Sequence, residues 1–170
     1  VVDKASTTAV AGSSPNPSLF GQGVTLTASL AAVAPGAGTP SGTVTFYDGA
    51  VSLGTVTLSG GAASLSTSAL AVGSHPITVV YSGDASFNGS TSAVLDHEVQ
   101  RAATVVTLDT GGTMPCQDNL RPLSAFVAVA APGAGLPSGT VTFLDAGVPV
   151  GSAPLLDGRA TLTAYTLTGG

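Results

Sequence analysis

The chain has few charged residues for its length. Only 8% of its 170 residues are Asp, Glu, Lys or Arg, whereas soluble domains average roughly 25%. The net charge is −5, and the four basic residues are scattered along the chain: Lys4, Arg101, Arg121 and Arg159. Nucleic acids and anionic membrane surfaces are bound by clustered Lys and Arg side chains. The sequence therefore excludes nucleic acid as a partner and argues against a polybasic membrane anchor.

Long apolar runs and a leader sequence are also lacking. Apolar residues make up 44% of the chain, but they alternate with Thr and Ser, and no run approaches the roughly 20 residues that span a bilayer. We therefore expect no membrane insertion in this segment. The first residues, Val1 to Lys4, form neither the basic region nor the apolar core of a signal peptide. Either the chain is intracellular or it begins downstream of its signal, and its internal repeat favours the second alternative.

Tryptophan is missing, and cysteine occurs once, as Cys116. A single Cys excludes an intrachain disulfide and a Cys-based zinc site within the segment. The Cys pair and the buried Trp of a secreted animal-type immunoglobulin domain are therefore missing as well. The sequence also lacks a Gly-x-Ser-x-Gly nucleophile motif and a Gly-rich phosphate loop. We predict no catalytic residue and no cofactor-binding residue in this chain, and hence a protein that is not an enzyme.

An internal repeat dominates what is present. Residues 34–73 align without a gap to residues 131–170, at an offset of 97, and about half of the aligned positions are identical. The period is too long for a solenoid repeat and suits one β-sandwich domain of about 100 residues. Upstream the offset continues, since Thr7 aligns with Thr104 and Leu26 with Leu123. The chain is therefore predicted to be a window from a tandem array.

The same offset predicts the domain boundaries. Residues 1–4 align with the segment that joins the two repeats, so we interpret them as the tail of a preceding repeat. The first domain is then expected at 5–99, a linker at 100–102 and a second domain at 103–170. The second repeat ends where the first continues with two more strands, so the second sandwich is predicted to be incomplete in this chain. The linker has no Gly or Pro, which predicts a stiff connection.

Alternation with a period of two predicts an all-β fold of tandem immunoglobulin-like antiparallel β-sandwiches. In the segment from Val24 to Val33, every second residue is apolar and the residues between are mostly Thr and Ser. Inward positions are predicted at Val24, Leu26, Ala28, Leu30, Val44, Phe46, Ile77, Val79 and Tyr81. We expect seven strands in the first repeat, near 7–10, 24–33, 43–47, 52–58, 63–67, 76–81 and 92–99. A helical insertion at 30–34 is the local alternative, because the segment LAAVA favours neither a helix nor a strand.

Three separated motifs carry a family resemblance. SPNPSLFGQGVTLTASL (14–30), PSGTVTFYDG (40–49) and LAVGSHPITVVYSGDASFNGSTSA (70–93) occur in this order. Together they resemble the bacterial Ig-like repeat family of large secreted and cell-surface proteins. The resemblance covers the whole first repeat and implies an extracellular sandwich used as a spacer, stalk or adhesive module without catalytic residues. The second repeat departs from it at 110–120, where TGGTMPCQDNL replaces the first motif.

His75 is predicted to be structural. It lies at the start of a strand, where a Tyr of immunoglobulin-like folds bonds back to the backbone, and a ring nitrogen can make the same bond. The alternative is a metal or catalytic histidine, which needs a partner, and the other histidine lies about 22 residues away at position 97. Asp48, Asp84 and Asp145 are predicted turn residues, because Asp carboxylates bond to nearby backbone N–H groups.

Asp96, His97 and Glu98 form the most acidic cluster. Neighbours on a strand point to opposite faces, so Asp96 and Glu98 share one side and His97 faces away. We interpret the cluster as solvated charges at a strand edge. Asp96 and Glu98 are candidate ligands for a calcium ion near the linker, but calcium takes six to eight oxygens and the sequence supplies too few.

Cys116 aligns with Leu19, which indicates a partly buried free thiol or one that pairs outside this segment. Thr rows such as Thr25 and Thr27 are predicted to face outward, where they are typical of a solvated sheet and, alternatively, of a surface that binds a flat ligand. The expected partners are neighbouring repeats of the same protein, with a surface glycan or protein ligand as an open alternative.

Three functions follow, in order of preference. The first is a stalk or adhesive segment of a bacterial surface protein, located outside the cell. The second is an ancillary, carbohydrate-binding domain of a secreted polysaccharide-acting enzyme. The third is a subunit of an extracellular filament, in which strands from another chain complete the second sandwich, since unpaired edges accept added strands.

Overall fold

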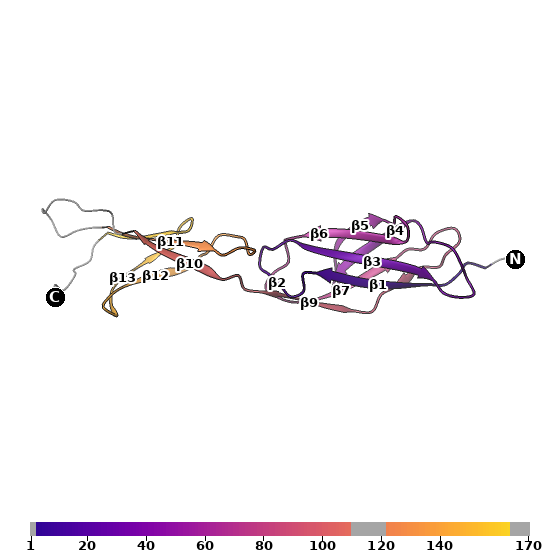
Figure 1. Cartoon of the computed structure of the whole chain (residues 1–170), viewed down its shortest axis with the longest axis horizontal. Helices are drawn as coiled ribbons and strands as arrows, with labels where there is room; N and C mark the ends of the chain where they lie inside the picture. The colour runs from indigo at the N-terminus through magenta and orange to yellow at the C-terminus, as the bar shows by residue number, and fades with distance from the viewer. Residues whose placement is uncertain (1–2, 110–121, 164–170) are drawn as a thin grey trace, which may run out of the picture. The chain divides into compact units, whose positions relative to one another are not determined.

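A computed structural model describes residues 3–109 and 122–163 of the chain. Every regular element in these two ranges is a β-strand, which confirms the all-β prediction (Figure 1). The chain divides into two compact units, Val1–Arg101 and Ala102–Gly170. Nothing in the described part of the chain is a helix long and apolar enough to cross a membrane.

The first unit contains nine strands in two sheets. They are β1 (Thr7–Ser14), β2 (Ser18–Leu19), β3 (Val24–Ala32), β4 (Thr43–Asp48), β5 (Val51–Thr57), β6 (Ala62–Thr67), β7 (Gly73–Tyr81), β8 (Ser90–Thr91) and β9 (Leu95–Gln100). One sheet has the order β1-β3-β6, and the other has the order β2-β9-β7-β4-β5, with β8 paired to β7. All neighbours are antiparallel except β2 and β9, which run parallel.

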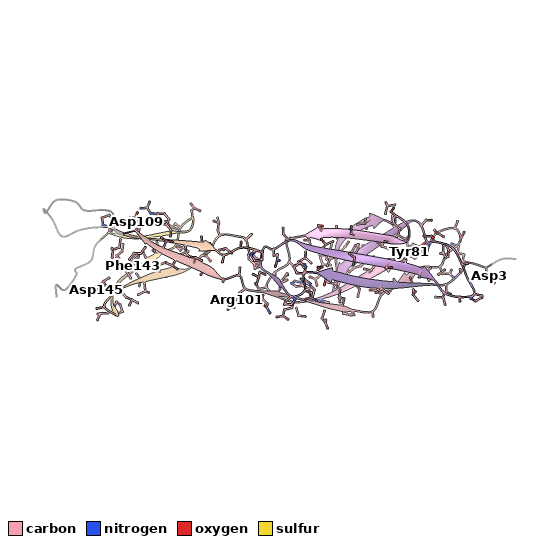
Figure 2. The ribbon with its side chains drawn as sticks, in the orientation of Figure 1. Asp3, Tyr81, Arg101, Asp109, Phe143 and Asp145 are labelled. Atoms are coloured by element: carbon pink, nitrogen blue, oxygen red, sulfur yellow. The ribbon has the colours of Figure 1, made fainter. Side chains whose placement is uncertain are left out.

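The core of the first unit is the set of inward positions that alternation predicted. Leu26, Val44, Phe46, Ile77 and Val79 have no exposed surface. The other predicted inward residues, Val24, Ala28, Leu30 and Tyr81, are also buried. Burial of this kind contributes about 25 cal/mol per Å² of apolar surface, which is why one apolar face per strand suffices to hold two sheets together. Figure 2 shows Tyr81 within this unit.

Several strand boundaries differ from the sequence-based prediction. The first strand continues to Ser14 instead of ending near Val10, and the last begins at Leu95 instead of Ser92. The segment 30–34 is not helical, because β3 continues to Ala32 and pairs with β1 up to that residue. β9 also includes Gln100, which the prediction assigned to the linker. Two-residue strands such as β2 offer no alternation to detect.

The second unit repeats part of this arrangement. Its described strands are β10 (Thr104–Asp109), β11 (Leu123–Val129), β12 (Thr140–Asp145), β13 (Val148–Pro154) and β14 (Arg159–Leu162). They form a three-stranded sheet, β10-β11-β14, and a two-stranded sheet, β12-β13. Its buried apolar residues among those described are Ala125, Phe143, Ala153 and Ala160. Figure 2 labels Phe143 within this unit. Cys116 and the divergent segment 110–120 lie outside the described residues.

Candidate functional site

Asp48 and His75 form an ion pair at one end of the larger sheet. His75 lies near the start of β7, and Asp48 is the last residue of the neighbouring β4. The ring Nδ1 of His75 lies 2.6 Å from the Asp48 Oδ2, and its Nε2 lies 2.8 Å from the carbonyl oxygen of Ala71. The sequence-based prediction placed a ring nitrogen of this residue against nearby backbone. The bond to Asp48, by contrast, was not predicted, because a turn role alone was assigned to that carboxylate.

Both partners of the His75 ring accept hydrogen bonds and donate none. A carboxylate and a carbonyl can be satisfied together only by a ring with hydrogens on both nitrogens, which is the imidazolium form. Burial by itself lowers the pKa of His75, but the bonds to Ala71 and Asp48 and the charge of Asp48 outweigh it and raise the pKa above 6.5. The side chains of His75 and Asp48 retain only 12% and 23% of their exposure. The pair is therefore a partly buried ion pair.

His97 lies directly opposite His75 in the β7–β9 ladder. Its side chain has no exposed surface, so the interpretation of the whole Asp96–Glu98 cluster as solvated was wrong for this residue. The ring Nε2 lies 3.0 Å from Ser18 Oγ, and Nδ1 lies 3.1 Å from Ser13 Oγ. Burial lowers the pKa of His97, and the nearby charge of His75 lowers it further, so both effects favour the neutral ring.

The contact between His97 and Ser18 resembles a base beside a nucleophile. Here Ser18 itself is buried, and Nδ1 of the ring faces Ser13 in place of the carboxylate that orients a catalytic histidine. A substrate has no path to the Ser18 oxygen in this arrangement. The His97 network therefore satisfies buried polar groups and supplies no reactive centre.

Asp96 and Glu98 point away from this network and are exposed. No group of three or more His, Cys, Asp or Glu side chains within 3–109 and 122–163 is arranged to hold a metal ion. Asn16 bonds instead to the backbone of the same strand, with Nδ2 donating to Asp96 O at 2.9 Å and Oδ1 accepting from Glu98 N at 3.0 Å. The strand is thus held through its backbone, while its carboxylates remain in solvent.

Asp84 organises the opposite end of the first unit. Its Oδ1 accepts from the N–H groups of Ser86 and Phe87, at 2.7 and 2.8 Å. Its Oδ2 accepts from the N–H and the hydroxyl of Ser41, at 3.0 and 2.6 Å. The bonds from Ser41 and those from Ser86 and Phe87 hold the pKa of the Asp84 carboxyl well below its ordinary range, although burial acts in the opposite direction. The carboxylate therefore joins two loops that are 43 residues apart in sequence.

The chain entering the first unit is held by the same loop. Ala5 N donates to Ser86 O at 2.9 Å, and Asn88 N donates to Ala5 O at 2.8 Å. Lys4 Nζ donates to the backbone oxygen of Asp84 at 2.6 Å, and the Asn88 side chain donates to Lys4 O at 3.1 Å. Residues 4 and 5 are consequently part of the fold of the first unit.

Gly36 and Gly133 provide a cradle for the entering chain in both units. A Cβ on Gly36 would lie 2.6 Å from the Cβ of Ala5, and a Cβ on Gly133 would likewise clash with the Cβ of Ala102. Each cradle carries the same backbone bonds, from Val33 N to Ser6 O at 2.9 Å and, 97 residues later, from Ala130 N to Ala103 O at 2.8 Å. The repeated APGAG sequence therefore has a physical reason, since only glycine lets the entering chain approach so closely.

The remaining predicted site residue, Asp145, ends β12 at a two-residue hairpin. It pairs with Val148, and the residues between, Ala146 and Gly147, both have positive φ, of 47° and 87°. Figure 2 shows Asp145 at this turn. The aligned Asp48 also ends its strand at a two-residue hairpin, closed by pairing with Val51.

Exposed Thr and Ser side chains recur along the strands of the first unit. Thr25 and Thr27 are exposed, as predicted, and other Thr side chains bond to one another, as Thr45 and Thr55 do at 2.8 Å. A shallow hollow bordered by β1, β3, β5 and β6 is lined by Val, Ala, Gly, Thr and Ser alone. It contains no titratable group with which to bind or activate a substrate.

The sequence-based prediction missed the polar partners of β9, namely Ser13, Asn16 and Ser18. Leu95, His97 and Val99 alternate with Asp96 and Glu98, so period two alone places His97 on the inner face with Val99. The sequence-based prediction used this alternation to turn His97 away from Asp96 and Glu98. It did not identify the partners of His97, because a two-residue parallel strand such as β2 has no pattern of its own.

Comparison with known proteins adds three findings. A family model described as bacterial Ig-like domain (group 3) matches residues 10–100, which is more than half of the chain. The fibronectin(III)-like modules of Clostridium thermocellum CbhA form a similar solved structure, with 18% sequence identity and a TM-score of 0.40 over 92% of this chain and 80% of that one. No curated protein matches the chain.

Proposed function

The chain belongs to the bacterial Ig-like domain family, group 3, and on this premise we propose that it is a structural or adhesive segment, a stalk or spacer, of a large bacterial extracellular or cell-surface protein. In this role the chain has no catalytic activity. Its partners are neighbouring repeats of the same protein, and its task is to hold other parts of that protein at a distance from the cell.

The repeated cradle is the observation that supports this proposal most directly. Ala5 on Gly36 and Ala102 on Gly133 show the same local contact at the entrance of each unit. In the first unit the chain enters beside the loop at 84–88 and leaves beside β2, at the other end of the sandwich (Figure 1). A module with its entrance and exit at opposite ends adds length with each copy, which is what a spacer requires.

Antibody labelling of intact bacterial cells tests the location. Antibodies raised against this chain are expected to label unpermeabilised cells, and external protease is expected to remove the label. Labelling that appears only after permeabilisation would overturn the proposal. Binding of the chain to insoluble polysaccharides, together with its release into the medium in one polypeptide with a catalytic domain, would instead favour an ancillary role in a secreted enzyme.

A further inference from the structure

Residues 13–20 run alongside residues 96–100, and we refer to these two segments together as the parallel clamp. Ser18 pairs with Val99 and Leu19 with Gln100 in parallel register, and Phe20 N donates to Gln100 O at 2.8 Å. The side chain of Asn16 adds its two bonds to the backbone at Asp96 and Glu98. These contacts join the first part of the first unit to its last strand.

The clamp lies between the two points at which tension enters the unit. The entering chain leads through Ala5 directly into β1, which continues to Ser14, and the leaving chain is the end of β9. Both members of the clamp run in the same direction. Opposed pulls on the two ends therefore load the β1–β3 ladder and the clamp together, and within the clamp they slide 13–20 backward along 96–100, so that the load acts along the strands.

Sliding loads all the bonds of the clamp at once. A hairpin pulled open from its end loses its bonds one after another, whereas two strands that slide must lose theirs in one step, which raises the barrier to forced unfolding. Such unfolding is governed by the unfolding rate. His97 lies behind the clamp with no exposed surface and bonds to Ser13 and Ser18, so water cannot replace these bonds one at a time.

We propose that the parallel clamp is the element of the first unit that bears tension between its ends, an inference that rests on the proposed stalk function. Asn16 then resists the applied force directly, because its exposed side chain contributes two of the loaded hydrogen bonds. The buried ring of His97 excludes water from the inner side of the clamp.

Single-molecule force spectroscopy on the full 170-residue chain, held by handles at its two ends, tests the proposal. The first unit is identified by its length gain, since its 97-residue repeat extends by roughly 3.5 Å per residue and frees more chain than the second. Asn16→Ala removes the two side-chain bonds. Tyr81→Phe is the matched control, because it removes a bond of 2.7 Å to Ser41 O that lies outside the clamp.

The free energy of unfolding of each variant is first measured by equilibrium denaturation, so that its loss of stability relative to the parent chain is known. At constant force, Asn16→Ala is expected to shorten the lifetime of the first unit by the full factor that its equilibrium loss predicts, because the clamp bonds are broken in the transition state, and Tyr81→Phe by much less than its own loss predicts. Equal behaviour of the two variants after this correction would overturn the clamp. Cell-surface labelling decides the stalk function separately, so a weak clamp in a surface-exposed chain would reject only this inference.

Discussion

His75 and His97 lie opposite each other in the β7–β9 ladder, yet their ionisation shifts in opposite directions. The ring of His75 bonds to two acceptors, which favours the imidazolium form. The ring of His97 is fully buried between two serine hydroxyls, which favours the neutral form. The environment therefore favours the charged form of one histidine and the neutral form of its cross-strand neighbour.

Stability of the first unit should have a maximum near pH 6.5 from these two groups. The raised pKa of His75 gives stability that is fully present below pH 6.5 and is lost as the pH rises through the folded-state pKa. The lowered pKa of His97 gives stability that is present above pH 6.5 and is lost as the pH falls toward its folded-state pKa. Urea midpoints measured between about pH 5 and 8 check this.

The variant His75→Gln isolates one side of that profile. It should flatten the alkaline decline and leave the acid decline in place, because Gln does not titrate. Proton NMR titration of the two histidine rings provides an independent check, with one transition above and one below pH 6.5. Two coincident transitions near pH 6.5 would contradict the assignment.

Replacing His97 by Ala should destabilise the first unit by about 3 kcal/mol, because it leaves a cavity and an unsatisfied buried hydroxyl at Ser18. Equilibrium denaturation of the whole chain measures this loss. The control Glu98→Ala changes the adjacent, exposed side chain and should stay within about 0.5 kcal/mol of the parent. Similar losses for the two variants would show that His97 is not part of the core.

The core could be predicted from the sequence, whereas the polar networks could not. Val24, Leu26 and Ala28 alternate with Thr, and this pattern determined both their strand and their buried face. The pairing of His75 with Asp48 and its placement opposite His97 depend on strand register, which brings together residues that are 27 and 22 positions apart. No local pattern encodes such a register, because it follows from how whole sheets pack.

The Asp84 carboxylate should control the order of the entering chain. Asp84→Ala removes four accepted bonds, so the amides of Ala5 and Asn88, which donate to Ser86 O and Ala5 O and so join the entering chain to this loop, are expected to exchange hydrogen faster. Hydrogen exchange followed by mass spectrometry measures this effect. Because the pKa of Asp84 is lowered, its contribution is present above about pH 3.8 and is lost as the pH falls further.

Exposed amides in the β4–β5 hairpin serve as the internal control for that experiment. They lie at the other end of the unit and should exchange at the parent rate in Asp84→Ala. Faster exchange in both places would indicate general destabilisation, and unchanged exchange at Ala5 would show that the loop does not hold the entering chain.

Gly36→Ala should weaken the cradle at the entrance of the first unit. The new Cβ would lie 2.6 Å from Ala5 and 3.0 Å from the Val33 carbonyl oxygen, so the entering chain must shift, at a cost of about 1–3 kcal/mol. Gly23→Ala is the control, because a Cβ there meets nothing within 4 Å. It should leave the stability equal or raise it by about 0.5 kcal/mol through a less flexible unfolded chain. If thermal denaturation shows Gly36→Ala to be as stable as Gly23→Ala, close approach of the entering chain does not explain why both cradles contain glycine.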